Sequence, residues 1–397
     1  MQSKDYGALH GVRILDLSRI LAGPSATQLL GDLGADVVKV EKPNEGDDTR
    51  KWGPPYVVGH NGSDTDESAY YLSANRNKRS IAIDIATGEG RELLLRLLEN
   101  ADVLVENYKV GGLKKYGLDY QTLQKQFPRL VYCSVTGFGQ TGPYATRAGY
   151  DFLIQGMGGI MSLTGEANGT PMKVGVGIAD VMTGMYAAVG ILAALRHRDA
   201  TGQGQHIDIS LLDSQIAWLV NAGTNYLTSG NLPRRLANGH PNIVPYQVFD
   251  ASDAPMILAV GNDSQFRKFC EVAGEARLAD DPRFITNVAR IENRDEICGL
   301  VQSILGTRSR EEWLRLLQAV NVPCGPVNNL KDVFDDPHVR ARGAHLKMPC
   351  DWAQGGELNL LSNPLRLSGS PVSYRRPPPR LNEHEDEILT DWNARTP

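Results

Sequence analysis

Residues 12–41 have the sequence VRILDLSRILAGPSATQLLGDLGADVVKVE, in which two apolar runs flank a helical pattern. The runs at 12–17 and 35–41 are short and rich in aliphatic residues, as is typical of buried strands. Between them Ala22-Gly23-Pro24-Ser25 opens a helix, because a proline in the first helical turn loses no hydrogen bond. The helix ends near Gly34. This strand–helix–strand order predicts a βαβ unit with parallel strands.

The same alternation continues along the first half of the chain. Further strands are predicted at residues 80–85, 102–106, 130–135 and 206–210, and helices at 88–101 and 211–228. Beyond residue 238 the pattern changes to a strand-like segment at 246–260 and helices at 264–272, 293–305 and 310–320. We therefore expect an α/β fold in which a doubly wound, Rossmann-like large domain is joined to a smaller α+β domain. The predicted boundaries are 1–224 for the first part of the large domain, 225–340 for the small domain with its linkers, and 341–397 for a C-terminal segment that returns to the large domain.

Composition narrows the class of protein. The 397 residues are 41% hydrophobic and 22% charged, which is typical of a soluble enzyme with more than one core. The net charge of -5 argues against nucleic acid as a partner. Five cysteines without a CxxC pair indicate neither a disulfide framework nor a metal site. Because no signal peptide precedes the first strand, and the apolar stretch at 181–195 is too short for a bilayer, we expect a cytoplasmic protein without a membrane partner.

The turn after the first strand invites comparison with dinucleotide-binding proteins. Their Gly-x-Gly-x-x-Gly pattern is absent, because the turn carries only Gly23. The helix start at residues 22–27 could still hold a phosphate through its free N–H groups. It could equally be a plain packing turn, and the pattern alone leaves both interpretations open.

Four blocks of sequence carry a resemblance to a known family. They are LAGP (21–24) with GDLGADVVKVEKP (31–43), NRNKRSI (75–81), DVLVENY (102–108) with GGL (111–113), and SVTGFGQTGP (134–143) with GYD (149–151) and ADVMTG (179–184). Together they resemble the class III CoA-transferase family, whose members include formyl-CoA and carnitine CoA-transferases. Residues 238–247 and 321–342 are similar to the branch that moves CoA from succinyl-CoA to glutarate, hydroxymethylglutarate or itaconate.

The resemblance implies both an assembly and a reaction. Members of this family form an interlocked homodimer, in which each chain makes an open ring threaded by the other. The reaction moves CoA from an acyl-CoA donor, here succinyl-CoA, to a second carboxylic acid, here a dicarboxylate. It passes through aspartyl-anhydride and aspartyl-CoA thioester intermediates. No tightly bound cofactor is expected, since the CoA thioester is a co-substrate.

Asp180 matches the nucleophile of the family. It lies between small residues, in GVGIAD and VMTG, which would let a bulky thioester approach its carboxylate. An aspartate before a helix is also a preferred N-cap, so Asp180 could serve the helix rather than catalysis, or do both.

The CoA contacts implied by the resemblance lie in the first three blocks and, for Lys115, just after the third. Leu21 and Ala22 would line the cleft for adenine and phosphate. Five further residues would contact the nucleotide end: Lys42, Lys78, Asn107, Tyr108 and Lys115. Lys78 and Arg79 form a basic pair suited to a phosphate. For any single lysine the alternative is a solvated surface side chain.

The sequence does not single out one residue that binds the acceptor acid. A second carboxylate needs a cation, and the candidates are Arg50, Arg147, Arg234 and Arg235. Arg50 could instead form a structural ion pair. Gly239 and His240 are candidate substrate contacts, because they lie where the family places a glycine-rich loop over the active site, and His240 could donate to the substrate carboxylate. This loop has a single glycine, however, and a lone loop histidine is often only solvated.

A racemase acting on α-methylacyl-CoA is the competing hypothesis, since it shares the fold. That chemistry needs two acid/base groups, typically a histidine and an aspartate. In that branch a histidine precedes the aspartate of the Gly-x-Asp block, where this chain has Tyr150. Tyrosine is a poor base at neutral pH, because its pKa is about 10. Tyr150 is retained as a candidate substrate contact.

Overall fold

The chain is divided into two compact units. The computed structural model describes residues 7–392; of these, 7–159, 174–219 and 337–392 form the larger unit, and 160–173 and 220–336 the smaller one. The sequence placed the corresponding boundaries at 224/225 and 340/341. It did not assign segment 160–173 to the smaller unit, because no periodic pattern marks that segment.

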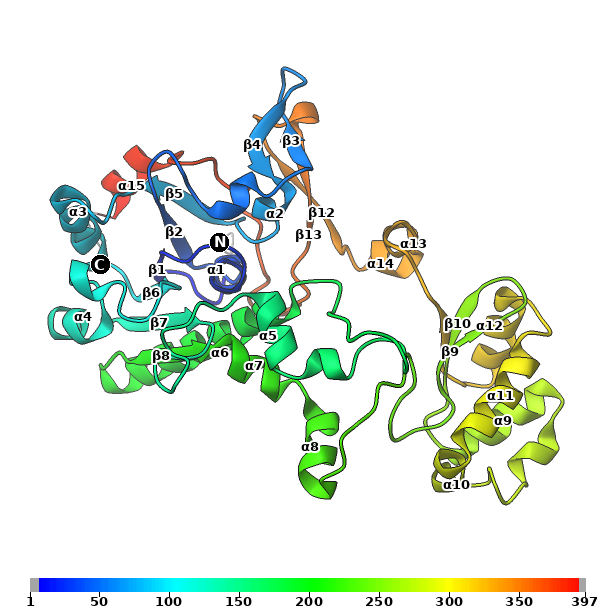
Figure 1. Cartoon of the computed structure of the whole chain (residues 1–397). Coiled ribbons are helices and arrows are strands. Elements are labelled where there is room, and N and C mark those ends of the chain that lie inside the picture. The colour runs from blue at the N-terminus through cyan, green and yellow to red at the C-terminus, as the bar shows by residue number, and fades with distance from the viewer. Residues whose placement is uncertain (1–6, 393–397) are drawn as a thin grey trace. The chain divides into compact units, whose positions relative to one another are not determined.

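A six-stranded sheet forms the centre of the larger unit (Figure 1). Its strands are β1 (Arg13–Asp16), β2 (Asp36–Glu41), β5 (Lys78–Ala82), β6 (Val103–Glu106), β7 (Val131–Thr136) and β8 (His206–Ser210). Their order is β5-β2-β1-β6-β7-β8, and every neighbouring pair is parallel. The strand order changes direction between β1 and β6. In open parallel sheets, such a switch point is where ligands bind, outside the carboxyl ends of the strands.

Helices cover both faces of this sheet. One face carries α1 (Ala22–Asp32), α6 (Ile178–Thr201) and α7 (Leu211–Ala217), and the other carries α3 (Gly88–Leu98), α4 (Tyr120–Gln126) and α15 (Glu385–Asp391). Consecutive strand residues enter opposite cores, as Ile14 and Leu15 do on β1. The strands therefore carry aliphatic residues on both faces, as Val37 and Val38 do on β2, which agrees with the aliphatic-rich runs in the sequence.

Helices α1 and α6 approach each other unusually closely. A Cβ on Gly184 would lie 2.7 Å from the carbonyl oxygen of Ala22, so only glycine fits there. This contact brings the start of α1 next to the first turn of α6. Among the described residues, α6 alone is long and apolar enough to cross a membrane. Its buried face, including Ala187 and Ile191, packs in the core, as in the core helix of a globular domain.

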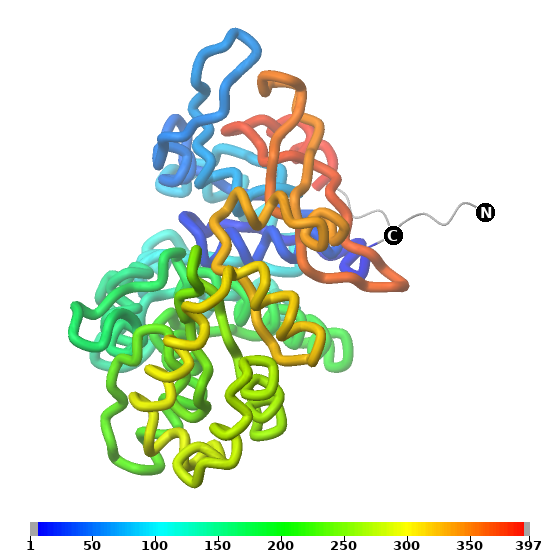
Figure 2. Tube along the Cα trace, turned by 90° about the vertical axis from the view of Figure 1, so that its right-hand side faces the viewer, coloured from blue at the N-terminus to red at the C-terminus, as the bar shows by residue number. Residues whose placement is uncertain are grey.

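Both ends of the chain contribute to the larger unit. The unit includes two antiparallel hairpins, β3 (Tyr56–Val58) with β4 (Asp64–Ser68) and β12 (His345–Pro349) with β13 (Glu357–Leu361). After β13, the C-terminal segment runs beside the first helix and strands (Figure 2). Its Arg375 donates to the carbonyl oxygens of Gly31 and Ala35, at 2.8 Å each. The N–H of Asn77 donates to the carbonyl of Arg376. Shorter helices complete the unit: α2 (Ala69–Leu72), α5 (Asp151–Met157) and α14 (Pro337–Ala341).

The smaller unit has a three-stranded antiparallel sheet and its own core. Its strands are β9 (Tyr246–Asp250), β10 (Pro255–Ala259) and β11 (Cys324–Pro326), and its helices are α8 (Val220–Ser229), α9 (Asp263–Ala273), α10 (Asn287–Glu292), α11 (Arg294–Leu305), α12 (Arg310–Ala319) and α13 (Leu330–Asp335). The prediction of a single helix at 211–228 is wrong. It is broken into α7 and α8 before Val220, whose φ is 37°.

Candidate active site

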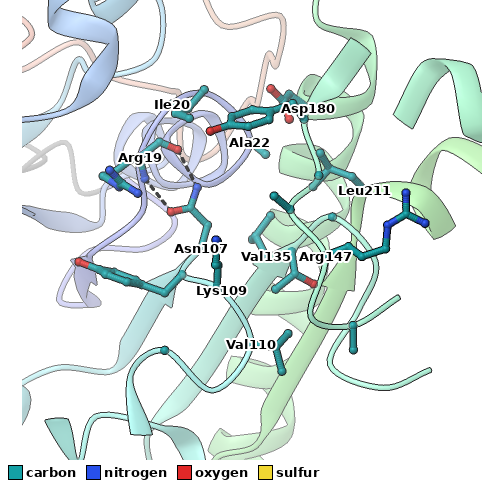
Figure 3. A pocket seen from close by; sticks show the side chains of 18 of the residues that line it. Arg19, Ile20, Ala22, Asn107, Lys109, Val110, Val135, Arg147, Asp180 and Leu211 are labelled. Carbon is teal, nitrogen blue, oxygen red and sulfur yellow. Dashed lines mark hydrogen bonds between the residues drawn. The ribbon is translucent and has the colours of Figure 1, made fainter. Parts of the chain in front are cut away.

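A cavity of about 430 Å³ opens at the switch point of the large sheet (Figure 3). The loop after β1 and the loop after β6 form one side, and Asp180 from α6 lies among the lining residues. The described lining residues include Arg19, Ile20, Leu21, Ala22, Asn107, Tyr108, Lys109, Lys115, Arg147, Tyr150 and Asp180. The cavity therefore gathers segments that are far apart in the sequence, as the strand order requires.

Asp180 is a buried carboxyl group that faces this cavity. Its residue is 9% exposed, and burial raises its pKa to about 7, with the charge of Asp151 as the second cause. No hydrogen-bond donor lowers that pKa. A carboxylate that ionises near neutral pH is more basic than a solvated one, and strongly shifted groups in clefts are typical of functional sites.

Asp151 caps the helix that carries Asp180. Its Oδ1 atom accepts hydrogen bonds from the backbone N–H groups of Ala179, at 2.8 Å, and Asp180, at 3.4 Å. Its Oδ2 atom accepts from Gln155, whose Oε1 in turn accepts from the N–H of Val174. The N-cap interpretation of Asp180 is wrong, because the helix begins before it and Asp151 supplies the acceptor. No role was predicted for Asp151, although it lies in the Gly149-Tyr150-Asp151 block.

The charged residues that line the cavity are mostly cations. Among the described lining residues, the cations are Arg19, Lys109, Lys115 and Arg147, and the only carboxylate is that of Asp180. The guanidinium group of Arg147 lies over the rings of Phe138 and Tyr144, at 5.2 and 4.5 Å from their centroids. A chain with a net charge of -5 thus has a locally positive cavity, suited to an anionic ligand.

A second cavity of about 490 Å³ adjoins the first. The two share Arg19, Tyr108 and Tyr116 as lining residues. Lys42 lines the second cavity, where it forms an exposed ion pair with Glu45. Of the seven predicted CoA contacts, five line the first cavity and Lys42 the second: Leu21, Ala22, Asn107, Tyr108, Lys115 and Lys42. The two cavities together offer room for a long ligand.

Lys78 is a correction to the predicted contacts. Its side chain is fully buried, and its ammonium group contacts Asp16 at 3.0 Å and the carbonyl oxygen of Pro24 at 2.9 Å. Neighbouring Arg79 is also committed, since its guanidinium group contacts Asp36 at 2.6 Å. Neither cation of the predicted phosphate-binding pair is available to a ligand.

Arg50 is a second correction. It is buried in an ion-pair network with Glu41 and Glu67, and it also donates to the hydroxyl group of Tyr71 at 2.6 Å. The structural ion pair that the sequence left open is therefore the correct interpretation. Among the four candidate arginines, Arg147 is the one that lines the cavity with Asp180.

The remaining candidates fall into two groups. Tyr150 lines the first cavity and is 60% exposed. Gly239 and His240 belong to the smaller unit, where Nδ1 of His240 accepts from the N–H of Asn242 at 3.0 Å. Arg235, also in that unit, donates to the carbonyl oxygens of Glu166 and Gly169. A role for these three residues in substrate binding stays a prediction.

The described residues contain no cluster of side chains that could bind a metal ion. Within residues 7–392 no group of three or more His, Cys, Asp or Glu side chains is arranged to hold a metal ion. The buried carboxylate of Asp180 lies in the first cavity together with the cations Arg19, Lys109, Lys115 and Arg147. A carboxylate beside cations, at the switch point of a doubly wound sheet, is an arrangement that can bind an anionic ligand and act on it as a nucleophile.

Comparison with known proteins gives the family. The chain belongs to CoA-transferase family III, whose sequence profile matches residues 9–385. It is 48% identical to the succinate–glutarate CoA-transferase of Agrobacterium fabrum over 96% of this chain and 95% of that protein. It is 42% identical to the human succinyl-CoA:glutarate CoA-transferase, over 96% and 85%. Among solved structures it resembles a CaiB/BaiF family protein from Brucella suis, with a TM-score of 0.85 and 48% identity over 98% of this chain and 100% of that one.

Proposed function

We propose that this enzyme transfers CoA from succinyl-CoA to another dicarboxylate, with glutarate as the first candidate acceptor. The names of the similar transferases from Agrobacterium fabrum and human support this donor and acceptor. The observation that carries the proposal is the buried carboxylate of Asp180 in a cavity lined by four cations. Such a cavity attracts a polyanionic CoA ester and holds a nucleophile beside it.

The chemistry follows from the carboxylate. Ionised Asp180 attacks the thioester carbonyl of succinyl-CoA, the C–S bond breaks, and a mixed anhydride and CoA thiolate form. The thiolate attacks the aspartyl carbonyl, which releases succinate and leaves an aspartyl-CoA thioester. The acceptor carboxylate attacks that thioester and expels the thiolate again. The thiolate then attacks the acceptor's acyl carbon, which frees Asp180 and yields the new acyl-CoA. No net proton or electron is needed in this sequence.

The surroundings of Asp180 suit these steps. A partly desolvated carboxylate is a better nucleophile than a solvated one, since water no longer stabilises its charge. Arg147 is the candidate for the distal carboxylate of the acceptor, because a guanidinium group can bind a carboxylate through two hydrogen bonds. Five residues are proposed to contact CoA: Leu21, Ala22, Lys42, Tyr108 and Lys115.

The test uses exchange and trapping together. Purified enzyme is mixed with succinyl-CoA and glutarate, itaconate, hydroxymethylglutarate or malate, and new acyl-CoA is detected by mass spectrometry. Hydroxylamine, added during turnover, should convert the aspartyl thioester to a hydroxamate on the peptide that contains Asp180. Asp180→Ala should lose both signals. Asp199→Ala, a matched change at an exposed position of the same helix, should keep both.

Two outcomes would count against the proposal. Full exchange by Asp180→Ala would remove Asp180 as the nucleophile. No new acyl-CoA from any acid, despite CoA binding, would remove dicarboxylates as acceptors.

We also propose that the enzyme is a cytoplasmic homodimer with interlocked chains. Within the larger unit, α6 exposes Met185, Tyr186 and Val189, and such apolar side chains are typically covered by a partner. Sedimentation at micromolar concentration should give a dimer that dilution does not dissociate. A monomer under these conditions would contradict the interlocked assembly.

A further inference from the structure

The loop that joins β1 to α1 contains a residue in an unusual backbone conformation. Ile20 has a φ of 74°, in the left-handed region. Glycine, asparagine and aspartate occupy that region most easily, whereas a β-branched side chain crowds the backbone there. Such strain persists only when neighbouring groups hold the chain in place, and it is concentrated at functional sites.

Asn107 holds the residue before Ile20 by both ends of its side-chain amide. Its Oδ1 atom accepts from the N–H of Arg19 at 3.0 Å, and its Nδ2 group donates to the carbonyl oxygen of Arg19 at 2.8 Å (Figure 3). The amide thus acts like a strand partner for one residue of the loop. Asn107 itself begins the loop after β6, so the two loops at the switch point are fastened together.

The buried ion pair between Lys39 and Asp47 binds the same loop. The two carboxylate oxygens of Asp47 accept from the N–H of Ile20 at 3.2 and 3.3 Å. The ammonium group of Lys39 contacts Asp47 at 2.8 Å and donates to the carbonyl oxygen of Ser18 at 2.9 Å, and both charged side chains are fully buried. The backbone of residues 18–20 is therefore bound at four polar groups by side chains from other segments.

The held loop forms one wall of the cavity. Arg19, Ile20, Leu21 and Ala22 all line it, together with Asp180. If Ile20 relaxed to a negative φ, the path of the chain into α1 would change, and with it the surface offered to a ligand.

We propose that Asn107 and Asp47 are positioning residues that hold Ile20 in its left-handed conformation and so preorganise the CoA-facing loop. This inference rests on the proposed function, because it takes CoA as the ligand of the cavity. It also assigns Asn107 a different role from the direct CoA contact expected from sequence, since both ends of its amide are engaged by the Arg19 backbone. Binding then needs no ordering of the loop, which is how preorganisation raises affinity.

The test is a double-mutant cycle read as CoA affinity by calorimetry. Asn107→Ala in the wild-type background should weaken CoA binding about tenfold, because the strained loop relaxes when it is no longer held. In an Ile20→Gly background the left-handed conformation carries no steric cost, so the same change should weaken binding about twofold at most. Asp47→Asn should follow the same pattern, and Asn61→Ala, in the β3–β4 turn, serves as the matched control.

The outcomes separate the alternatives. An equal loss of affinity in both backgrounds would make Asn107 a direct ligand contact and overturn the inference. No loss in either background would overturn it as well. If Asp47→Asn fails to fold because Lys39 loses its buried partner, the Asn107 cycle decides alone. Wild-type protein that fails to bind CoA would overturn the proposed function and this inference together, whereas CoA binding with an additive cycle would overturn only the inference.

Discussion

Replacing Asp180 by asparagine should make the larger unit more stable, by an amount that grows with pH. The folded protein holds this carboxyl group at a pKa of about 7, against 3.8 for the ordinary group. Below pH 3.8 the group is neutral in both the folded and the unfolded chain, so its burial has no electrostatic cost. Above pH 7 the folded protein carries a charge that the unfolded chain would expose to water, and the cost is complete.

The size of the effect follows from the two pKa values. A pKa difference of one corresponds to about 1.36 kcal/mol. The charge on Asp180 therefore lowers the free energy of unfolding of the wild type by about 2 kcal/mol at pH 5 and about 4 kcal/mol at pH 8. Asparagine has nearly the same shape and no charge at either pH. Because 1 kcal/mol shifts the melting temperature of a domain of this size by about 2–4 °C, Asp180→Asn should melt on the order of 10 °C higher at pH 8.

The assay is thermal unfolding followed by circular dichroism at pH 5 and pH 8. Asp199→Asn is the control, because that side chain is on the same helix but 61% exposed, so its change should be small at both pH values. A gain for Asp180→Asn that is equal at the two pH values, or no larger than that of the control, would refute the reasoning. A real gain would mean that the enzyme retains a destabilising charge for catalysis.

Three further predictions concern neighbouring parts of the larger unit. Asp151→Asn keeps a cap acceptor but removes a charge that raises the pKa of Asp180, so the acid limb of kcat/KM should move to lower pH. An unmoved limb would rule out electrostatic coupling between the two carboxyl groups. Gly184→Ala should lower the free energy of unfolding by about 1–3 kcal/mol and reduce CoA binding, because the new Cβ would meet the backbone of α1 at 2.7 Å. An unchanged melting temperature and CoA affinity would show that the helices can separate freely. Lys78→Met should destabilise the protein by about 3–5 kcal/mol, because a buried carboxylate loses its partner. A normally stable Lys78→Met protein with weakened CoA affinity would instead restore the role predicted from sequence.

The strands of the large sheet were predictable because they are buried on both faces. Runs such as residues 35–41 are rich in valine although they include Asp36 and Lys39, and this marks them as strands but does not give their order in the sheet. The break between α7 and α8 was not predictable in this way. Residues 218–220 carry no proline or glycine, and the helical pattern continues across them.

Within the site, the resemblance to the family pointed to Asp180 as the candidate nucleophile, but the sequence did not indicate what surrounds it. Asp180 stands in a run of small residues, which is a local feature. Its cap, Asp151, comes from another helix, and that contact exists only after folding. Lys78 illustrates the opposite error, since a lysine in sequence suggests solvent and only the tertiary contact with Asp16 shows that it is buried.

The path of the C-terminal segment has a consequence for how the protein is made. The N–H of Asn77 and the guanidinium group of Arg50 bind the carbonyl oxygens of Arg376 and Pro379, and Ile388 and Trp392 fill the core beneath β5 and α3. A ribosome therefore releases nearly the whole chain before the first strands it synthesised can complete their packing. Residues 220–336, by contrast, are contiguous and have their own core, so they can fold while synthesis continues. During that interval the early strands are the part of the nascent protein most exposed to aggregation and most in need of a chaperone.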